Sequence, residues 1–169
     1  MLNRLTKLAM VISFFVFALF AIDDWLGQLL GWHDELFFAL DLPDQAQPSD
    51  GLVVFGGLIT LFGLIGLGAA YLAIWRILGD GIGQDFRLLA RRLQHLAYGL
   101  IAFWLSGYLT FSVVRTLIAW QTLPDSDIPI VWDPFHVDLV FAISAVALIA
   151  ISKMMERAWA AEDETQHFL

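Results

Sequence analysis

The stretch Leu52–Ile74, which reads LVVFGGLITLFGLIGLGAAYLAI, decides the fold class of this chain. It contains no charged residue, and the next charge along the chain is Arg76. A helix needs about 20 predominantly apolar residues to cross the hydrocarbon core of a bilayer. The stretch is long enough, and it predicts a membrane-spanning helix over residues 51–77.

Three further apolar stretches predict three further spans. The longest of them carries a single charge, Arg115, and the two others reach spanning length by recruiting their flanks. The three stretches are Leu8–Ile22, Leu96–Trp120 and Leu139–Ile151. We therefore expect helices at about residues 5–25, 51–77, 86–120 and 137–159.

The composition agrees with a membrane protein of one domain, residues 1–169. Of the 169 residues, 59% are hydrophobic and 15% are charged, whereas soluble domains are about half apolar and a quarter charged. Short connections place consecutive helices antiparallel. We predict an all-α, integral membrane, four-helix up-and-down bundle.

The first apolar stretch has a second interpretation, a cleaved signal peptide. Arg4 and Lys7 give it a basic start, and its apolar run has the right length. Residues 18–22, which precede Asp23, read ALFAI and place large side chains where a signal peptidase needs small ones. We therefore favour an uncleaved membrane anchor.

The basic residues predict the orientation of the helices. Eight of the nine Lys and Arg residues lie at the termini or around the connection between the second and third helices. The other two connections, roughly residues 23–51 and 121–137, contain none. Because basic residues are retained in the cytoplasm, we expect both termini to be cytoplasmic.

The first outer connection predicts an additional helix. Between Trp25 and Leu40 the apolar side chains recur with a period near 3.6 residues, which is typical of an amphipathic helix. We interpret it as a short helix that lies in the outer membrane interface. The alternative is that the first membrane helix continues outward.

Small residues recur at spacings of three and four along the second and third helices. Such faces let two backbones approach closely, and close packing drives helix association in lipid. We expect them to pack within one chain, with a homo-oligomer or partner interface as the alternative. The packing candidates are Gly56, Gly63, Gly66, Ala70, Gly99, Ala102 and Ser106.

The inner connection ends in an arginine-rich amphipathic turn. Arg87, Arg91 and Arg92 are the candidates for contact with lipid headgroups or with a protein partner. The glycines before them follow no strand, and no Gly-Lys-Ser/Thr is present, so we interpret them as a turn and not as a phosphate-binding loop.

The sequence carries no catalytic motif, and we expect no catalytic residue, no cofactor and no metal. The chain has no cysteine, which excludes thiolate-ligated metals and thiol catalysis. A metal held by His33 and His136 on the outer side is the alternative to solvated loop histidines. Carboxylates at mid-membrane depth, typical of pumps and proton-coupled transporters, are missing.

The charge balance restricts the partners. The formal net charge is −8, and nucleic-acid binding needs clustered Lys and Arg, so we expect no nucleic-acid partner. Acidic residues crowd the two outer connections, where they either keep the loops soluble or attract a cationic partner.

Arg115 and Asp138 are the candidates for a structural ion pair. Arg115 precedes the outer end of the third helix, and Asp138 opens the fourth helix from the same side. Because consecutive helices are antiparallel, we expect the two side chains at similar depth. The alternative is that Arg115 extends alone toward the outer interface.

Residues 84–97, QDFRLLARRLQHLA, and a C-terminal segment that ends in residues 155–164, MERAWAAEDE, resemble the YoaS-like family of bacterial inner-membrane proteins. The resemblance implies four helices, a bacterial inner membrane and no catalytic residues. It also implies a companion role beside small helix-turn-helix regulators.

We therefore expect a non-enzymatic inner-membrane protein that acts by protein–protein contact. It would be either the partner of a sensor or regulator, or an accessory subunit of a larger membrane complex, surrounded by membrane lipid. The alternative is a small-molecule or ion transporter that works as an oligomer.

Overall fold

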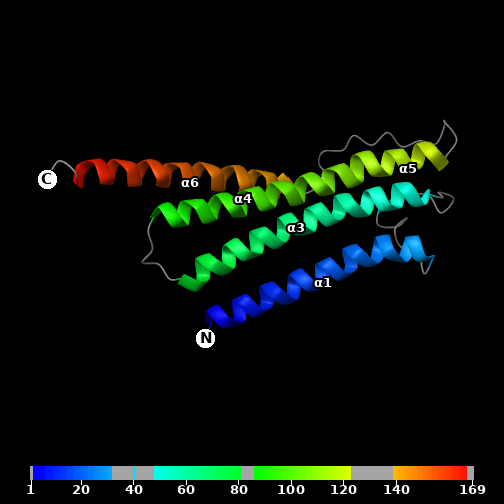
Figure 1. Cartoon of the computed structure of the whole chain (residues 1–169), viewed down its shortest axis with the longest axis horizontal. Helices are drawn as coiled ribbons and strands as arrows, with labels where there is room; N and C mark the ends of the chain where they lie inside the picture. The colour runs from blue at the N-terminus through cyan, green and yellow to red at the C-terminus, as the bar shows by residue number, and fades with distance from the viewer. Residues whose placement is uncertain (1, 32–39, 41–47, 81–85, 123–138, 167–169) are drawn as a thin grey trace.

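The computed structural model describes residues 2–31, 40, 48–80, 86–122 and 139–166, and nearly all of them are helical. The helix α4 continues through a π-helical turn, η1, into α5. The elements in Figure 1 are α1 (Leu2–Leu30), α3 (Asp50–Asp80), α4 (Phe86–Leu109), η1 (Thr110–Val114), α5 (Arg115–Thr122) and α6 (Leu139–Gln166).

Within these residues, four helices are long and apolar enough to cross a membrane, which confirms the all-helical fold class. The four spans are Arg4–Leu30, Asp50–Gly79, Phe86–Gln121 and Leu139–Ala161. They leave large apolar side chains uncovered, such as Phe20 at 68% and Ile143 at 66% exposure. Such surfaces suit a hydrocarbon solvent, in which apolar groups need no protein cover.

The predicted interfacial helix starts inside α1. Residues from Trp25 to Leu30 form the last turns of α1, which then ends at Gly31 with a φ of +66°. A left-handed glycine commonly follows a helix C-terminus because it has no Cβ to clash. The 3.6-residue period over Trp25–Leu30 therefore belongs to the continuation of the first long helix. Residues 32–39 of the predicted helix lie outside the described residues.

The long helices pack in chain order, α1 on α3, α3 on α4 and α4 on α6 (Figure 1). Each neighbouring pair is antiparallel. Phe14 of α1 meets Tyr71 of α3 with ring centroids 5.7 Å apart, and Phe103 of α4 meets Phe141 of α6 at 5.4 Å. Both termini therefore lie at one end of the molecule, which we call the termini end.

The four helices form an open row and not a closed bundle. Among the described residues, α1 and α6 share no extensive contact, although a closed bundle would pack the first helix on the last. Phe103 of α4 contacts both flanks, since its ring meets Phe17 of α1 at 5.5 Å and Phe141 of α6 at 5.4 Å. The prediction of antiparallel neighbours is confirmed, and the described helices form an open row (Figure 1).

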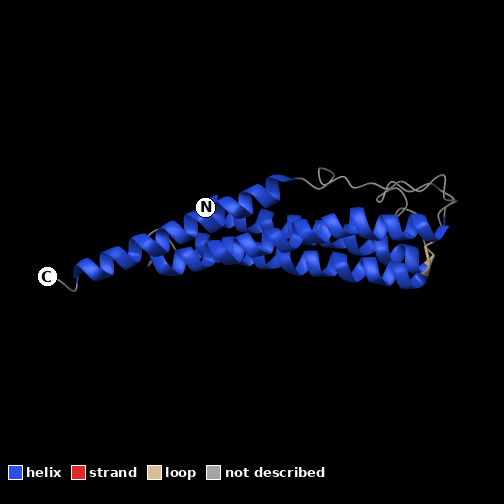
Figure 2. Ribbon diagram, turned by 90° about the horizontal axis from the view of Figure 1, so that it is seen from above, coloured by secondary structure: helices blue, strands red, loops and turns tan. Residues whose placement is uncertain are grey.

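The helix α6 is shifted toward the termini end. Its first turns lie beside the middle of α4, and its last turns extend past the other helices (Figures 1 and 2). As a result, α6 makes no extensive contact with η1 or α5 within the described part of the chain. At the opposite end, the core is formed by side chains of α1, α3, η1 and α5 together with that of Leu40. Its buried members are Trp25, Leu40, Val53, Val114, Ile118 and Ala119.

Candidate functional site

The α3–α4 interface brings the small residues into direct contact. A Cβ atom added to Gly66 would lie 2.6 Å from the Cβ of Ala102. A Cβ atom added to Gly99 would lie 2.8 Å from the backbone nitrogen of Ala70. Real Cβ atoms do not approach so closely, so the two backbones meet here because glycine has no side chain.

The same small-residue stripe also serves the α1–α3 interface. A Cβ atom on Gly63 would overlap with the side chain of Ser106, whose hydroxyl donates a 2.7 Å hydrogen bond to the carbonyl of Ile59. Gly56 faces α1 instead, where the indole of Trp25 occupies the space of the missing Cβ. One stripe on α3 therefore supports a helix on either side.

The turn η1 lies beside the most polar part of the interior. The backbone N–H of Arg115 donates to the carbonyl of Thr110, five residues back, which defines the π-helical turn. The hydroxyl of Thr116 donates a 2.6 Å hydrogen bond to the carbonyl of Ser112. Turns of this kind hold one residue more than an α-helical turn and are frequent at functional sites. The buried polar side chains nearby are Ser106, Thr110, Ser112 and Arg115.

Arg115 is the charged group of this region, and it is only 5% exposed. It lies within the apolar span Phe86–Gln121 and next to Val114, which is fully buried. An ionisable side chain inside a membrane span is costly to keep there and marks a candidate functional position. Arg115 and the π-helical turn together form the strongest candidate site on the half of the row opposite the termini end.

We expect the deletion of Val113 to be tolerated because η1 already holds one residue more than an α-helix needs. Removing it converts the turn to α-helix and leaves both flanking segments in register. Deleting Leu105 instead rotates everything that follows by about 100°, since an α-helix has 3.6 residues per turn. The two side chains are matched at 39% and 38% exposure. Thermal unfolding in detergent should show the larger loss for the Leu105 deletion, and equal losses would contradict the register argument.

The predicted pair of Arg115 with Asp138 stays a prediction, because Asp138 lies outside the described residues. The shift of α6 toward the termini end affects this prediction because it changes the depth at which α6 begins (Figure 1). Phe141 packs on Phe103, which precedes Arg115 by 12 residues, or about 18 Å along a helix that rises 1.5 Å per residue. The described start of α6 therefore lies well short of the depth of Arg115, and the pair requires Asp138 to reach beyond the end of α6.

Two of the three arginines predicted to contact lipid or a partner are engaged within the chain. The guanidinium of Arg87 lies 5.0 Å from the ring centroid of Trp159 on α6. Arg92 donates a 3.0 Å hydrogen bond to the carbonyl of Arg76 on α3. Arg91 is exposed. These contacts make α4 the centre of the termini end, with its neighbours held on both sides.

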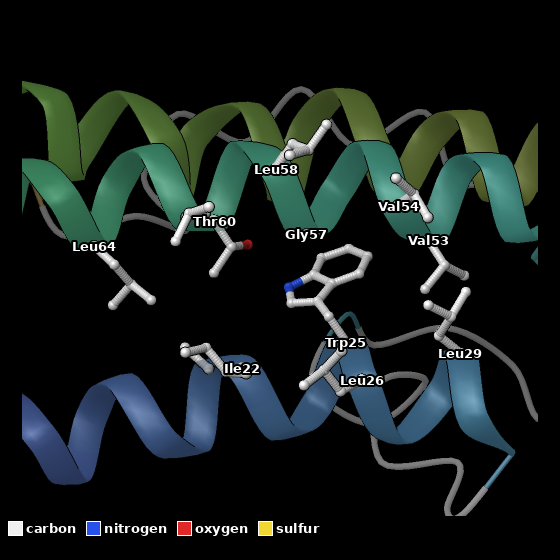
Figure 3. Close-up of a pocket in the computed structure, with 12 residues that line it drawn as sticks. Ile22, Trp25, Leu26, Leu29, Val53, Val54, Gly57, Leu58, Thr60 and Leu64 are labelled. Carbon is white, nitrogen blue, oxygen red and sulfur yellow. The ribbon is translucent and has the colours of Figure 1, made fainter.

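A cavity of about 300 Å³ lies between α1 and α3 near the end opposite the termini. Figure 3 shows the indole of Trp25 between the two helices, with Leu26 and Leu29 beside it on α1 and Gly57 facing it on α3. Trp25 is 8% exposed. The structure places this indole in the core cluster.

The structure places His95 on the exposed side of α4, whereas His33, His136 and His167 lie outside the described residues. Within the described parts of the chain, no three His, Cys, Asp or Glu side chains are grouped as metal ligands. The alternative metal site at His33 and His136 therefore remains a hypothesis.

Comparisons with known proteins give no relative for this chain. No protein-family model matches it, and neither the curated proteins nor the solved structures contain a match. The geometry of the described residues therefore carries the functional argument.

Sequence reasoning missed the π-helical turn and the burial of Trp25. The sequence of Thr110–Val114 is that of an ordinary apolar helix. One extra residue in a turn leaves no periodic signal from which a π-helical turn could be predicted. The burial of Trp25 had a signal, namely the pair Gly56-Gly57, which leaves room for a large ring on the neighbouring helix.

Proposed function

We propose that this chain is a non-enzymatic bacterial inner-membrane protein that acts by protein–protein contact. It would serve as the partner of a membrane sensor or regulator, or as an accessory subunit of a larger membrane complex. The observation that supports the proposal is the open row, in which α1 packs extensively on α3 alone and α6 on α4 alone among the described helices.

The two flanks of the row offer surfaces for another membrane helix. On α1, Leu19 and Phe20 are 67% and 68% exposed, and on α6, Ile143 and Val146 are 66% and 64% exposed. A partner helix can pack on either flank without displacing any helix of the row. Lipid can cover these apolar surfaces as well, so the crosslinking experiment below distinguishes a partner helix from lipid.

The C-terminal part of α6 offers a different surface, in the cytoplasm under the predicted topology. The contact of Arg87 with Trp159 and the 2.9 Å hydrogen bond from Gln94 to Glu156 fix the base of this extension on α4. Beyond Trp159 the helix continues to Gln166. A regulator of the kind that the YoaS-like resemblance implies would bind here, together with the exposed Arg91.

Site-specific photo-crosslinking in native membranes tests the proposal. A photoreactive residue at Phe20 or at Ile143 samples the two flanks, and one at Ile65, which is 65% exposed on α3, samples the middle of the row. We expect adducts to a specific protein from a flank and none from Ile65. Mass spectrometry after purification in mild detergent then identifies the adduct. Equal yields at all three positions, or adducts to lipid alone, would contradict a flank interface.

The alternative function is transport of a small molecule or an ion by an oligomer. The buried polar group around η1, with Arg115 at its outer end, is the observation that favours it. In the crosslinking experiment, adducts of the chain to itself from both flanks would support this alternative.

The predicted topology has its own test. Reporter fusions after Gln47 and after Ser126 should report an external location, and fusions after Gly83 and at Leu169 a cytoplasmic one, because eight of the nine basic residues then lie inside. A cytoplasmic signal at Gln47 would mean that α1 does not span the membrane.

A further inference from the structure

A second cavity lies between α1 and α3, nearer the termini end, and its volume is about 370 Å³. This size falls at the lower end of the range of about 300–1,000 Å³ that is typical of ligand pockets. The side chains that line it are hydrophobic or aromatic. They belong to Met10, Val11, Phe14 and Phe15 on α1 and to Gly68, Tyr71, Leu72 and Trp75 on α3.

The cavity opens to the outside of the row between two spans that are apolar enough to cross a membrane. Phe15 and Leu72, one on each wall, are both 59% exposed, and both lie within spans apolar enough to cross a membrane. The polar atom of Tyr71 is turned away into a 3.0 Å hydrogen bond with the hydroxyl of Ser13. An apolar slot that opens sideways into lipid is accessible to an acyl chain and not to a polar solute.

The floor of the slot depends on Gly68. A Cβ atom added there would meet the ring of Phe14 at 3.4 Å, so the space beside that ring exists because the residue is glycine. A larger side chain at position 68 would extend into the slot without touching the α3–α4 interface, where Gly66 lies.

A cation lies at the termini end of the slot. The Lys7 ammonium is 4.8 Å from the ring centroid of Trp75, and Trp75 is itself part of the lining. Lys7 also lies 3.1 Å from the position of a Cβ added to Gly79, close to the last turn of α3. Arg4 is exposed on α1 three residues away, which places it on the same face of that helix. The apolar slot therefore ends, on the side of the termini, in positive charge close to the end of the two apolar spans.

We propose that this groove, which we call the α1–α3 groove, binds one acyl chain of an anionic phospholipid whose phosphate contacts Lys7. A zwitterionic lipid fits less well, because its own ammonium group offsets the charge of its phosphate. Basic residues beside an anionic surface raise affinity by about fivefold each. Under the proposed topology the lipid belongs to the cytoplasmic leaflet, but its recognition does not depend on the proposed partner.

Native mass spectrometry of the purified chain in a neutral detergent tests the site, with phosphatidylglycerol and phosphatidylcholine as probes. We expect the wild-type chain to bind phosphatidylglycerol about fivefold more tightly than phosphatidylcholine. Lys7→Gln should equalise the two affinities, and Gly68→Leu should weaken binding of both lipids because it fills the groove. Inorganic phosphate alone should not compete, since the acyl chain supplies the apolar part of the recognition.

Lys153→Gln is the matched control. Lys153 is exposed on α6, three residues from Glu156, which binds Gln94 near the same end of the row. Its replacement removes the same charge away from the groove and should leave the lipid preference unchanged. Circular dichroism and gel filtration establish that each variant is folded.

The proposal would be overturned by equal wild-type affinities for the two lipids, by an equal loss of preference in Lys7→Gln and Lys153→Gln, or by unchanged binding in folded Gly68→Leu. The second result would show that surface charge attracts the lipid without a site. If Lys7 serves only to pack on Trp75 and α3, Lys7→Gln would lower the melting temperature and leave the lipid preference intact, which also refutes the proposal.

Discussion

Replacing Gly99 by alanine is expected to destabilise the fold by about 1–3 kcal/mol, the usual cost of overpacking a core. The added Cβ would lie 2.8 Å from the backbone nitrogen of Ala70 and 3.0 Å from its Cβ. A backbone atom cannot rotate aside as a side chain can, so α3 and α4 would have to separate along their closest approach. Gly66→Ala should act in the same way, because its Cβ would lie 2.9 Å from the carbonyl oxygen of Gly99.

Gly51→Ala is the matched control for this prediction. Gly51 is also in α3, and nothing lies within 4 Å of a Cβ placed there. Alanine in an open helical position reduces the freedom of the unfolded chain and stabilises by about 0.4–1 kcal/mol. The same substitution is therefore expected to change the melting temperature in opposite directions at the two positions. A stabilising effect at Gly99 would show that the helices do not touch there.

Replacing Arg115 by glutamine is expected to cost about 3–5 kcal/mol if its guanidinium is held by a buried partner, and less if the pair reaches water. Arg115 is 5% exposed and belongs to the core side of the α4–α5 helix. Removing the guanidinium leaves the buried groups that contact it without their partner, which destabilises the folded state. Arg91→Gln, at an exposed position of α4, should cost almost nothing by comparison, since exposed ion pairs contribute little. Thermal unfolding of both variants in the same detergent measures the difference.

The double-mutant cycle with Asp138→Asn decides whether Asp138 is the partner. If the two residues form a pair, the double variant loses less stability than the sum of the single variants. Strictly additive losses would assign the guanidinium to other groups, in line with the shift of α6 toward the termini end.

Both the proposed partner interface and the proposed lipid site depend on the absence of extensive contact between α1 and α6 among the described residues. A closed bundle would bury α1 against α6 and leave no flank for a partner helix. It would also narrow the access to the α1–α3 groove. Because α1 contacts α3 along one face only, lipid and protein partners can both reach it, one at the groove and the other at the opposite face.

The sequence by itself determined the number, the type and the approximate ends of the helices. Runs such as Leu52–Ile74 can satisfy their backbone polar groups in lipid only as helices, so composition and length decide the element without reference to its neighbours. The small residues on α3 and α4 also predict close helix packing from the sequence alone, because two backbones approach closely only where side chains are small. Which of these residues meet, such as Gly66 with Ala102 and Gly63 with Ser106, depends in addition on the register of the two helices.

The tertiary structure alone decided which helices meet, how far each is displaced along its neighbour, and where single residues are buried. Hydrophobic periodicity distinguishes core from water in a soluble protein, but in lipid the outside is as apolar as the inside. The sequence therefore could not indicate whether the row closes, that α6 is shifted, or that Trp25 is buried while Trp120 is 71% exposed. The π-helical turn at Thr110–Val114 is likewise visible only in the structure, where the N–H of Arg115 donates to the carbonyl of Thr110.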